Sequence, residues 1–328
     1  MKAAFVISLD FELFWGVRDS KSLRSYGNYV LGVREAIPKL LELFNEFHIK
    51  ATFATVGLLH FDSKETLVEA LPNKLPQYSN TKYTLTPEYI ESIGSNETTD
   101  PLHFGASLIK QIQASNKHEI GTHTFSHYYT LEEGADIETF KLDLKAAKQA
   151  AINSNTSFNT IIFPRNQYNS IFLEACKQEG LRGFRGAENS WIYKPLSRSK
   201  ESKWRRLVRF LDAYINISGY HTHKWPKLPH ESGLYNIPAS RFLRPYSHTL
   251  RAFESIRLDR ILNAMTHAAI NGQIFHLWWH PHNFGKDVEK NINFLRSILE
   301  HQQMLHNLYG FESHTMNKCY SLINNHEQ

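Results

Sequence analysis

The sequence predicts an α/β fold built from alternating strands and helices, and three observations lead to that prediction. Residues 3–9 form a near-continuous apolar run, as in a strand that is buried on both faces of a parallel sheet. Segments with apolar residues at helical spacing alternate with further short apolar runs along the chain. Apolar residues make up 41% of the 328 residues, which is enough for a large core. Together these features favour repeated strand–helix units around one sheet.

The first units follow the apolar run in order. A helix is expected over residues 34–47, where Ile37 and Phe44 belong to one apolar stripe. A strand is expected over residues 51–56. From about residue 60 to 103 the rhythm is broken by prolines and by many Asn, Ser and Thr residues. This composition predicts an insertion of turns and short helices after the second strand.

The remaining elements continue the alternation. Strands are expected to start near Thr160 and Ile274. Helices are expected over three ranges, which are 137–152, 258–270 and 288–304. From Asn307 the sequence is polar and poorly patterned. We therefore predict one domain over residues 1–306 and a polar C-terminal tail over residues 307–328.

Two carboxylates follow the first predicted strand. Asp10 and Glu12 are two residues apart, so in an extended chain their side chains lie on the same side. At the carboxyl ends of barrel strands such residues reach the mouth, where chemistry is done. The alternative is a strand end with two solvated acids. The aromatic neighbours Phe11, Phe14 and Trp15 count against full solvation.

Two histidines four residues apart form the second candidate cluster. His123 and His127 share one face if a helical turn follows the short apolar stretch before them. The chain has 18 histidines, so chance pairs at this spacing are expected. Combined with Asp10 and Glu12, however, the pair supplies two imidazoles and one carboxylate for a divalent metal and leaves a second carboxylate as a base. That set is the minimum for metal-assisted hydrolysis.

Ser8–Glu12 and His123–His127 resemble the first two motifs of the polysaccharide deacetylase family. The resemblance implies a distorted (β/α) barrel and metal-dependent hydrolysis of N-acetylated or O-acetylated sugars. It also implies that Asp10 is the base and that Glu12, His123 and His127 hold the metal. The family usually has two adjacent aspartates in the first motif, whereas here Phe11 separates an Asp from a Glu. The division of roles between the two acids therefore stays open.

Two weaker matches extend the resemblance. Residues 160–167 resemble a buried strand that ends in a Pro-Arg turn, like the family's third motif. By that match Arg165 would orient the catalytic carboxylate. Residues 186–191 resemble the fourth motif, which would make Trp191 a residue that lines the sugar groove.

The fifth motif matches more closely. Residues 274–282 resemble a strand that ends in Leu-x-x-His-Pro, and His280 would then be the general acid. His276 and His282 are rivals, because strand alternation puts His276 and His280 on the same face. Trp279 is a further candidate to stack on the sugar ring.

Basic residues are concentrated in one stretch of a chain whose net charge is +5. Between Arg182 and Arg209 there are nine Lys or Arg residues against two acids. The stretch is either a solvated basic face or a site for an anionic substrate, such as a sugar on a nucleotide or lipid pyrophosphate. In the second case Arg205 and Arg206 are candidate substrate-binding residues. Nucleic acid is not expected, since no recognition helix or base-stacking module is evident.

Composition also predicts the location of the protein. No stretch approaches the roughly 20 apolar residues of a membrane span. Cys176 and Cys319 provide no disulfide framework. The apolar run at the start is broken by Asp10 and is too short for a signal peptide. A cytoplasmic location is therefore expected.

The function predicted from these features is removal of an acetyl group from an acetylated sugar in surface polysaccharide biosynthesis, with zinc as the expected metal. One alternative is a related amidohydrolase acting on a non-sugar C–N bond. Another is a catalytically silent glycan-binding module. The sequence predicts neither the identity of the sugar nor the oligomeric state.

Overall fold

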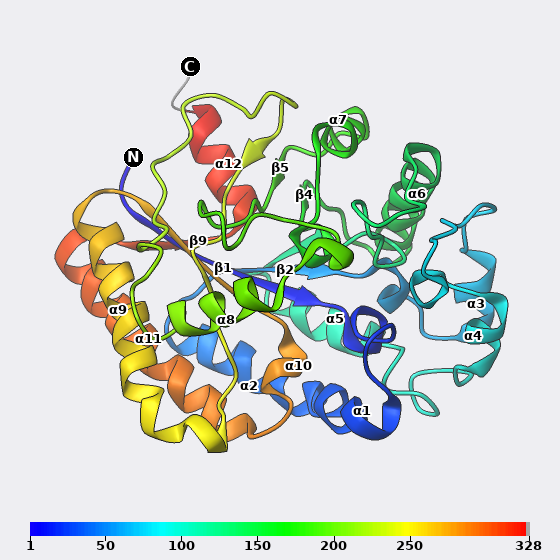
Figure 1. Cartoon of the computed structure of the whole chain (residues 1–328), viewed down its shortest axis with the longest axis horizontal. Helices are drawn as coiled ribbons and strands as arrows, with labels where there is room; N and C mark the ends of the chain where they lie inside the picture. The colour runs from blue at the N-terminus through cyan, green and yellow to red at the C-terminus, as the bar shows by residue number, and fades with distance from the viewer. Residues whose placement is uncertain (326–328) are drawn as a thin grey trace.

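Nine strands form one parallel sheet in the computed structural model, which describes residues 1–325 (Figure 1). The strand order is β6-β5-β4-β3-β2-β1-β8-β7, and β9 pairs with β1 outside this path. The strands are β1 Ala4–Phe11, β2 Ala51–Thr55, β3 Glu119–Thr122, β4 Thr160–Ile161, β5 Gly183–Phe184, β6 Tyr235–Asn236, β7 Arg241–Phe242, β8 Ile274–Trp279 and β9 Glu312–His314.

The two ends of the sheet lie close together. β6 and β7 stand at opposite ends of the strand order, yet only residues 237–240 connect them. Within this connection, the Ala239 amide donates to the Gly186 carbonyl and the Ser240 amide donates to the His276 carbonyl. The sheet must therefore curl until its ends meet, which gives a distorted (β/α) barrel. The predicted fold class is confirmed.

Helices surround the curled sheet (Figure 1). α11 packs against both α9 and α2, and α6 packs against α7. The helices are α1 Leu23–Leu31, α2 Val33–Glu46, α3 Lys64–Glu69, α4 Pro87–Ser92, α5 Ala106–Ala114, α6 Ile137–Asn153, α7 Ser170–Gln178, α8 Lys203–Asp212, α9 Glu254–Ile270, α10 Pro281–Phe284, α11 Val288–Tyr309 and α12 Met316–Asn325. The short helices α3 and α4 lie in the segment where the insertion was expected. Within residues 1–325, no helix has the length and apolar character needed to cross a bilayer.

The side chains on the two faces of β1 pack in two different apolar clusters. Phe5, Ile7 and Leu9 belong to the main hydrophobic core with the surrounding helices. Ala4 and Val6 point the other way and join a smaller apolar cluster. Since side chains alternate along a strand, Asp10 lies on the same face as Ala4 and Val6, which is the inside of the barrel. This alternation brings a carboxylate to the carboxyl end of the barrel interior.

The expectation of a polar C-terminal tail is wrong for residues 307–325. β9 pairs in parallel with β1, and α12 follows directly. Met316, Cys319 and Ile323 of α12 are buried in the apolar cluster that contains Ala4 and Val6 of β1. A three-residue strand is too short to show a period, so the pattern of the sequence could not identify it. Residues 326–328 of the predicted tail lie outside the described part of the chain.

Candidate active site

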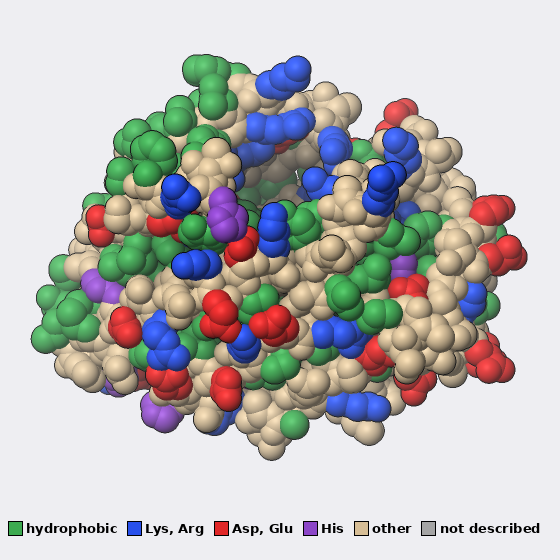
Figure 2. All heavy atoms as spheres, turned by 90° about the horizontal axis from the view of Figure 1, so that it is seen from below, with side chains coloured by type: hydrophobic (Ala, Val, Ile, Leu, Met, Phe, Trp, Pro, Cys, Tyr) green, Lys and Arg blue, Asp and Glu red, His purple; other side chains and the backbone are tan. Residues whose placement is uncertain are grey.

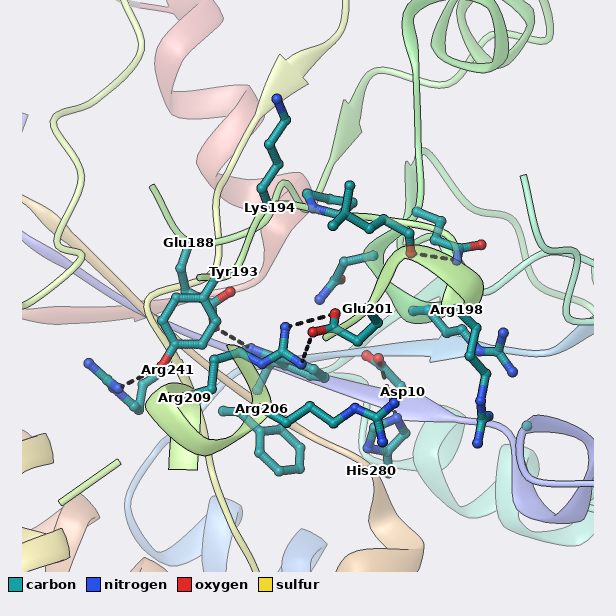
Figure 3. Close-up of a pocket in the computed structure, with 18 of the residues that line it drawn as sticks. Asp10, Glu188, Tyr193, Lys194, Arg198, Glu201, Arg206, Arg209, Arg241 and His280 are labelled. Atoms are coloured by element: carbon teal, nitrogen blue, oxygen red, sulfur yellow. Dashed lines mark hydrogen bonds and ion pairs between the residues drawn. The ribbon is translucent and has the colours of Figure 1, made fainter. Parts of the chain in front are cut away.

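Asp10 and Glu12 lie at the end of β1, and both line a cavity of about 450 Å³ (Figure 3). Asp10 is 2% exposed and Glu12 is 3% exposed. A buried carboxylate requires a cation or hydrogen-bond donors beside it. The alternative of two solvated acids therefore does not apply, and each acid has a separate set of partners.

Arg185 is the partner of Asp10. Its Nη1 donates to Oδ1 at 2.7 Å and its Nη2 donates to Oδ2 at 2.8 Å. Burial raises the pKa of Asp10, but the Arg185 guanidinium and nearby histidines outweigh burial, so that the pKa lies below its ordinary value. The guanidinium also lies over the Trp278 ring, at 4.2 Å from the ring centroid. Asp10 is therefore held ionised in a fixed orientation.

A chain of buried hydrogen bonds leads from Arg185 through Ser8 to His276. Its Nη1 also donates to Ser8 Oγ at 2.9 Å, and Ser8 Oγ lies 2.8 Å from His276 Nε2. His276 Nδ1 lies 3.0 Å from the Ile237 carbonyl, which can only accept, so Nδ1 carries the proton. Nε2 must then accept from the Ser8 hydroxyl. Each proton in this chain has one consistent position, which fixes the guanidinium against Asp10.

Glu12 faces the two histidines of the second motif. Its Oε2 lies 3.3 Å from His123 Nε2 and 3.0 Å from His127 Nε2. All three residues are buried, and their ligand atoms lie within 4.8 Å of one another. Burial raises the pKa of Glu12, but the surrounding histidines outweigh burial and hold that pKa well below its ordinary value.

These three residues fit a divalent metal. His123 Nδ1 lies 2.8 Å from the Ile162 carbonyl and therefore carries the proton, which leaves a lone pair on Nε2. That lone pair points at the Glu12 carboxylate, so two acceptors face each other in a buried space. A cation between them removes the repulsion, and the set of one carboxylate and two imidazoles matches the ligands preferred by zinc.

The loop that carries the two histidines does not form a helical turn, which was the condition for placing both on one helical face. Thr124 and His127 both have left-handed backbone conformations, with φ of 66° and 61°. Asp143 of α6 anchors the loop by accepting from the Phe125 amide at 2.7 Å, the Ser126 amide at 3.0 Å and the Ser126 hydroxyl. Such backbone strain costs about 1–3 kcal/mol for each residue and persists where surrounding contacts impose it. The histidines thus meet because the loop is held, not because of helical periodicity.

Of the three rival histidines on and after β8, only His280 lines the cavity. Its Nε2 lies 3.8 Å from Asp10 Oδ2 and 3.7 Å from Glu12 Oε1. His276 is fully buried in the hydrogen-bond chain behind Arg185. His282 is buried, stacks on His280, and has its Nδ1 3.8 Å from Glu12 Oε1. Of these three histidines, His280 is therefore the one that a substrate in the cavity can reach.

Arg165 does not orient Asp10, so that expectation is wrong. Its Nη1 donates to Glu132 at 3.1 Å, and its Nη2 pairs with Asp19. Residue 165 has a φ of 56° in a tight turn after β4, and its guanidinium lies over the Tyr129 ring. Arg185, and not Arg165, binds both carboxylate oxygens of Asp10. In the sequence it was only one of nine basic residues, because the strand before it, β5, has two residues and gives no recognisable pattern.

The two tryptophans predicted to contact the sugar do not line the cavity. Trp279 is fully buried and stacks on Phe284, because its side chain points toward the helices, so this prediction is wrong. Its neighbour Trp278 faces the other way and lines the cavity. Trp191 is 63% exposed and is not among the described residues around the cavity. Trp278 therefore lines the cavity, together with the aromatic residues Tyr193 and Phe242.

The two predicted substrate-binding arginines differ in their surroundings. Arg205 is buried, and its Nη2 donates to the carbonyls of Trp191, Ile192 and Lys194 at 2.9, 3.1 and 2.8 Å. It supports the backbone and cannot bind a substrate, so the prediction for Arg205 is wrong. Arg206 lines the cavity.

The cavity wall carries further cations (Figure 3). Arg209 pairs with Glu201 at 3.1 Å, and Arg241 pairs with Asp212 at 2.8 Å. Among residues 1–325, no carboxylate forms an ion pair with Arg206, or with two other cations of the wall, Lys194 and Arg244. These three cations therefore line the same cavity as the carboxylates of Asp10, Glu12 and Glu188.

Comparisons with solved structures agree with the fold. A Mycobacterium smegmatis protein assigned as a polysaccharide deacetylase is similar with a TM-score of 0.59 and 12% identity, over 99% of this chain and 91% of that chain. A Pseudomonas aeruginosa PAO1 protein with the same assignment has a TM-score of 0.56 and 10% identity, over 97% and 89%. The 4-α-glucanotransferase of Thermococcus litoralis has a TM-score of 0.52 and 11% identity, over 98% of this chain and 40% of that chain. At such identities these similarities concern the fold alone.

Part of the sequence matches the model of one protein family. No curated protein matches the chain. Residues 27–184, which include the His123–His127 loop, match the profile of the family described as Polysaccharide deacetylase. Residues 27–184 therefore carry a polysaccharide deacetylase domain, which confirms the resemblance that the motifs indicate.

Proposed function

We propose that this protein is a metal-dependent deacetylase that hydrolyses the acetyl group of an N-acetylated sugar, or of an O-acetylated one. The polysaccharide deacetylase domain supports carbohydrate deacetylation as the type of reaction. The observation that carries the proposal is the buried group of Glu12, His123 and His127 beside Asp10 on one cavity. When bound there, a divalent metal, which we expect to be zinc, would polarise the acetyl carbonyl and lower the pKa of a water molecule.

Asp10 is the proposed general base. It accepts a proton from the water whose oxygen forms the new bond to the acetyl carbon. Arg185 leaves one lone pair free on each carboxylate oxygen, so the ionised group still accepts a hydrogen bond. The lowered pKa keeps Asp10 in the ionised form that a base requires.

His280 is the proposed general acid. As the bond between the acetyl carbon and the sugar nitrogen breaks, His280 donates a proton to that nitrogen, and acetate and the amine leave. For an O-acetylated sugar the same proton goes to the departing oxygen. Its Nε2 lies within 3.8 Å of both acids, so base and acid can act on one substrate group.

The substrate of this proposal carries phosphate on its sugar, as nucleotide-linked and lipid-linked sugars do. Lys194, Arg206 and Arg244 support this part, because they line the cavity without a carboxylate partner among the described residues. Such cations bind phosphate through charge-assisted hydrogen bonds. Trp278 would stack on the sugar ring. A role in surface polysaccharide biosynthesis and a cytoplasmic location stay predictions.

Release of acetate from defined substrates tests the proposal. The panel contains a neutral N-acetyl sugar, its nucleotide diphosphate form, its lipid diphosphate form, an O-acetyl sugar and a cyclic amide. We expect acetate from the phosphate-bearing N-acetyl sugars and none from the Asp10→Asn variant. Turnover of the cyclic amide alone would favour the amidohydrolase alternative. Binding of the sugars without acetate from any member would favour the silent glycan-binding module.

A further inference from the structure

Helix α8 exposes three apolar side chains and buries two charged ones, Arg205 and Asp212. Trp204, Leu207 and Leu211 are 65%, 46% and 40% exposed. Their spacing of three and four residues places them on one stripe of the helix. A surface helix of a globular protein normally turns such a stripe toward the core. We call these three residues the α8 stripe.

Polar contacts hold the helix in this orientation. Arg205 donates to three backbone carbonyls of residues 191–194, and Arg209 donates to the Ile192 carbonyl at 3.0 Å. At the end of the helix, Asp212 is fully buried and pairs with Arg241 at 2.8 Å. Rotating the α8 stripe inward would break these contacts and leave buried charges without partners. The exposure of the α8 stripe is therefore built into the fold.

Basic residues flank the α8 stripe. Lys200, Lys203 and Arg206 are exposed, while the nearest acid, Glu201, pairs with Arg209. Beyond the helix, Ile215 and Ile217 are 62% and 51% exposed and extend the apolar surface. Figure 2 shows Lys and Arg side chains gathered around a hollow on one face of the molecule, with hydrophobic side chains next to them.

The same helix also lines the cavity of the candidate active site. Arg206, Arg209 and Ala213 face that cavity, and the α8 stripe lies on the outer side of the helix. Any partner that covers the stripe therefore lies at the cavity rim. It can present a substrate to Arg206 without leaving the stripe.

We propose that the surface of a membrane containing anionic lipids covers the α8 stripe. An apolar face with Trp and Leu, bordered by Lys and Arg, is the composition of helices that lie in the bilayer interface. Negative headgroups match Lys200, Lys203 and Arg206 in charge. A second copy of this chain fits less well, because a two-fold interface would bring the same cations together. This inference goes beyond the proposed function, since docking needs no turnover.

Vesicle cosedimentation of the full chain tests the inference. The probes are phosphatidylcholine vesicles with and without phosphatidylglycerol. We expect binding to the vesicles with phosphatidylglycerol and weaker binding to phosphatidylcholine alone. The variant Leu207→Glu/Leu211→Glu should partition at least about tenfold less, because two apolar contacts with the bilayer are replaced by charges. The matched control is Ile152→Glu/Leu308→Glu, which alters two apolar residues of α6 and α11 that are 61% and 64% exposed. It should bind like the wild type.

Fluorescence gives a second readout that does not depend on pelleting. Brominated lipids should quench the tryptophan emission of the wild type, and Trp204→Phe should lose most of that quenching. Acetate release from a water-soluble substrate should be unchanged in the Leu207→Glu/Leu211→Glu variant, because neither residue lines the cavity.

Three results would overturn the inference. One is wild-type protein that stays in solution with both kinds of vesicle, and another is equal binding by wild type and Leu207→Glu/Leu211→Glu. The third is a dimer in sedimentation velocity that this variant converts to a monomer without any vesicle binding, since a second copy would then cover the stripe. Absence of acetate release would count against the proposed function but would leave the vesicle result interpretable.

Discussion

Arg185 holds Asp10 by both carboxylate oxygens, at 2.7 and 2.8 Å, inside a barrel where neither residue is exposed by more than 2%. The two residues lie far apart in the chain and meet because β1 and β5 end on the same edge of the curled sheet. The pair determines both the charge and the direction of the proposed base.

Arg185→Lys should reduce kcat while leaving metal content unchanged. Lysine keeps the charge but cannot form the two parallel hydrogen bonds, so Asp10 loses its orientation. We expect a fall of about tenfold or more, because small displacements of a catalytic group are costly. Arg165→Lys is the matched control, since Arg165 binds Asp19 and Glu132 instead. A larger kcat loss in Arg165→Lys than in Arg185→Lys would contradict this assignment.

The two acids should respond differently to substitution. Asp10→Asn should keep the metal and lose about 10²–10⁴-fold in rate, as is typical for removal of a general base. Glu12→Ala should lose the metal as well as activity. Elemental analysis beside steady-state kinetics separates the two effects. Metal loss in Asp10→Asn with retention in Glu12→Ala would mean that the roles are reversed.

Arg206 and Arg205 should affect different properties. Arg206→Ala should raise KM for a phosphate-bearing substrate, with a smaller effect on a neutral acetylated sugar, because phosphate binding is remote from the scissile bond. Added salt should weaken the charged substrate selectively, since exposed charges are screened over about 8–10 Å. Arg205→Ala should instead lower thermal stability, because three carbonyls lose their donor. Equal KM values for both substrates in wild type and Arg206→Ala would make the basic stretch an ordinary solvated surface.

His276 should make the protein less stable in acid. Burial lowers its pKa from 6.5 to about 3 in the folded state. Between these values the unfolded chain binds one more proton than the folded chain, so the free energy of unfolding rises with pH. The contribution of His276 is complete above the unfolded pKa and is lost as pH falls toward about 3. His276→Gln should reduce the slope by up to about 1.4 kcal/mol per pH unit in chemical denaturation from pH 4 to 6. If His276→Gln leaves the dependence of the unfolding free energy on pH unchanged, His276 is not neutral in the folded protein.

Long elements and dense motifs made much of the fold and site predictable. β1 has eight residues, all buried, and α2 and α6 bury one face each, so the α/β class followed from a continuous apolar run and from apolar residues at helical spacing. The proximity of Asp10, Glu12, His123 and His127 followed from the family motifs rather than from geometry. No helical turn follows β3, because the Asp143 carboxylate holds the loop in another shape.

The missed features share a physical cause, which is that local sequence does not encode them. β4 and β5 have two residues each, too few to reveal which arginine faces the barrel interior. The choice between Trp278 and Trp279 depends on strand register, where a shift of one residue exchanges the two faces. The inverted orientation of α8 depends on carbonyls of residues 191–194 that only the folded chain brings to Arg205.

Metal content measured together with acetate release tests the central claim most directly. Wild-type protein should bind about one divalent metal, lose acetate release after chelation and regain it when zinc is added back. His123→Ala and His127→Ala should show neither metal nor recovery, whereas His306→Ala, an exposed histidine of α11, should behave like the wild type. Wild-type metal content in both ligand variants, or acetate release that survives chelation, would contradict the account.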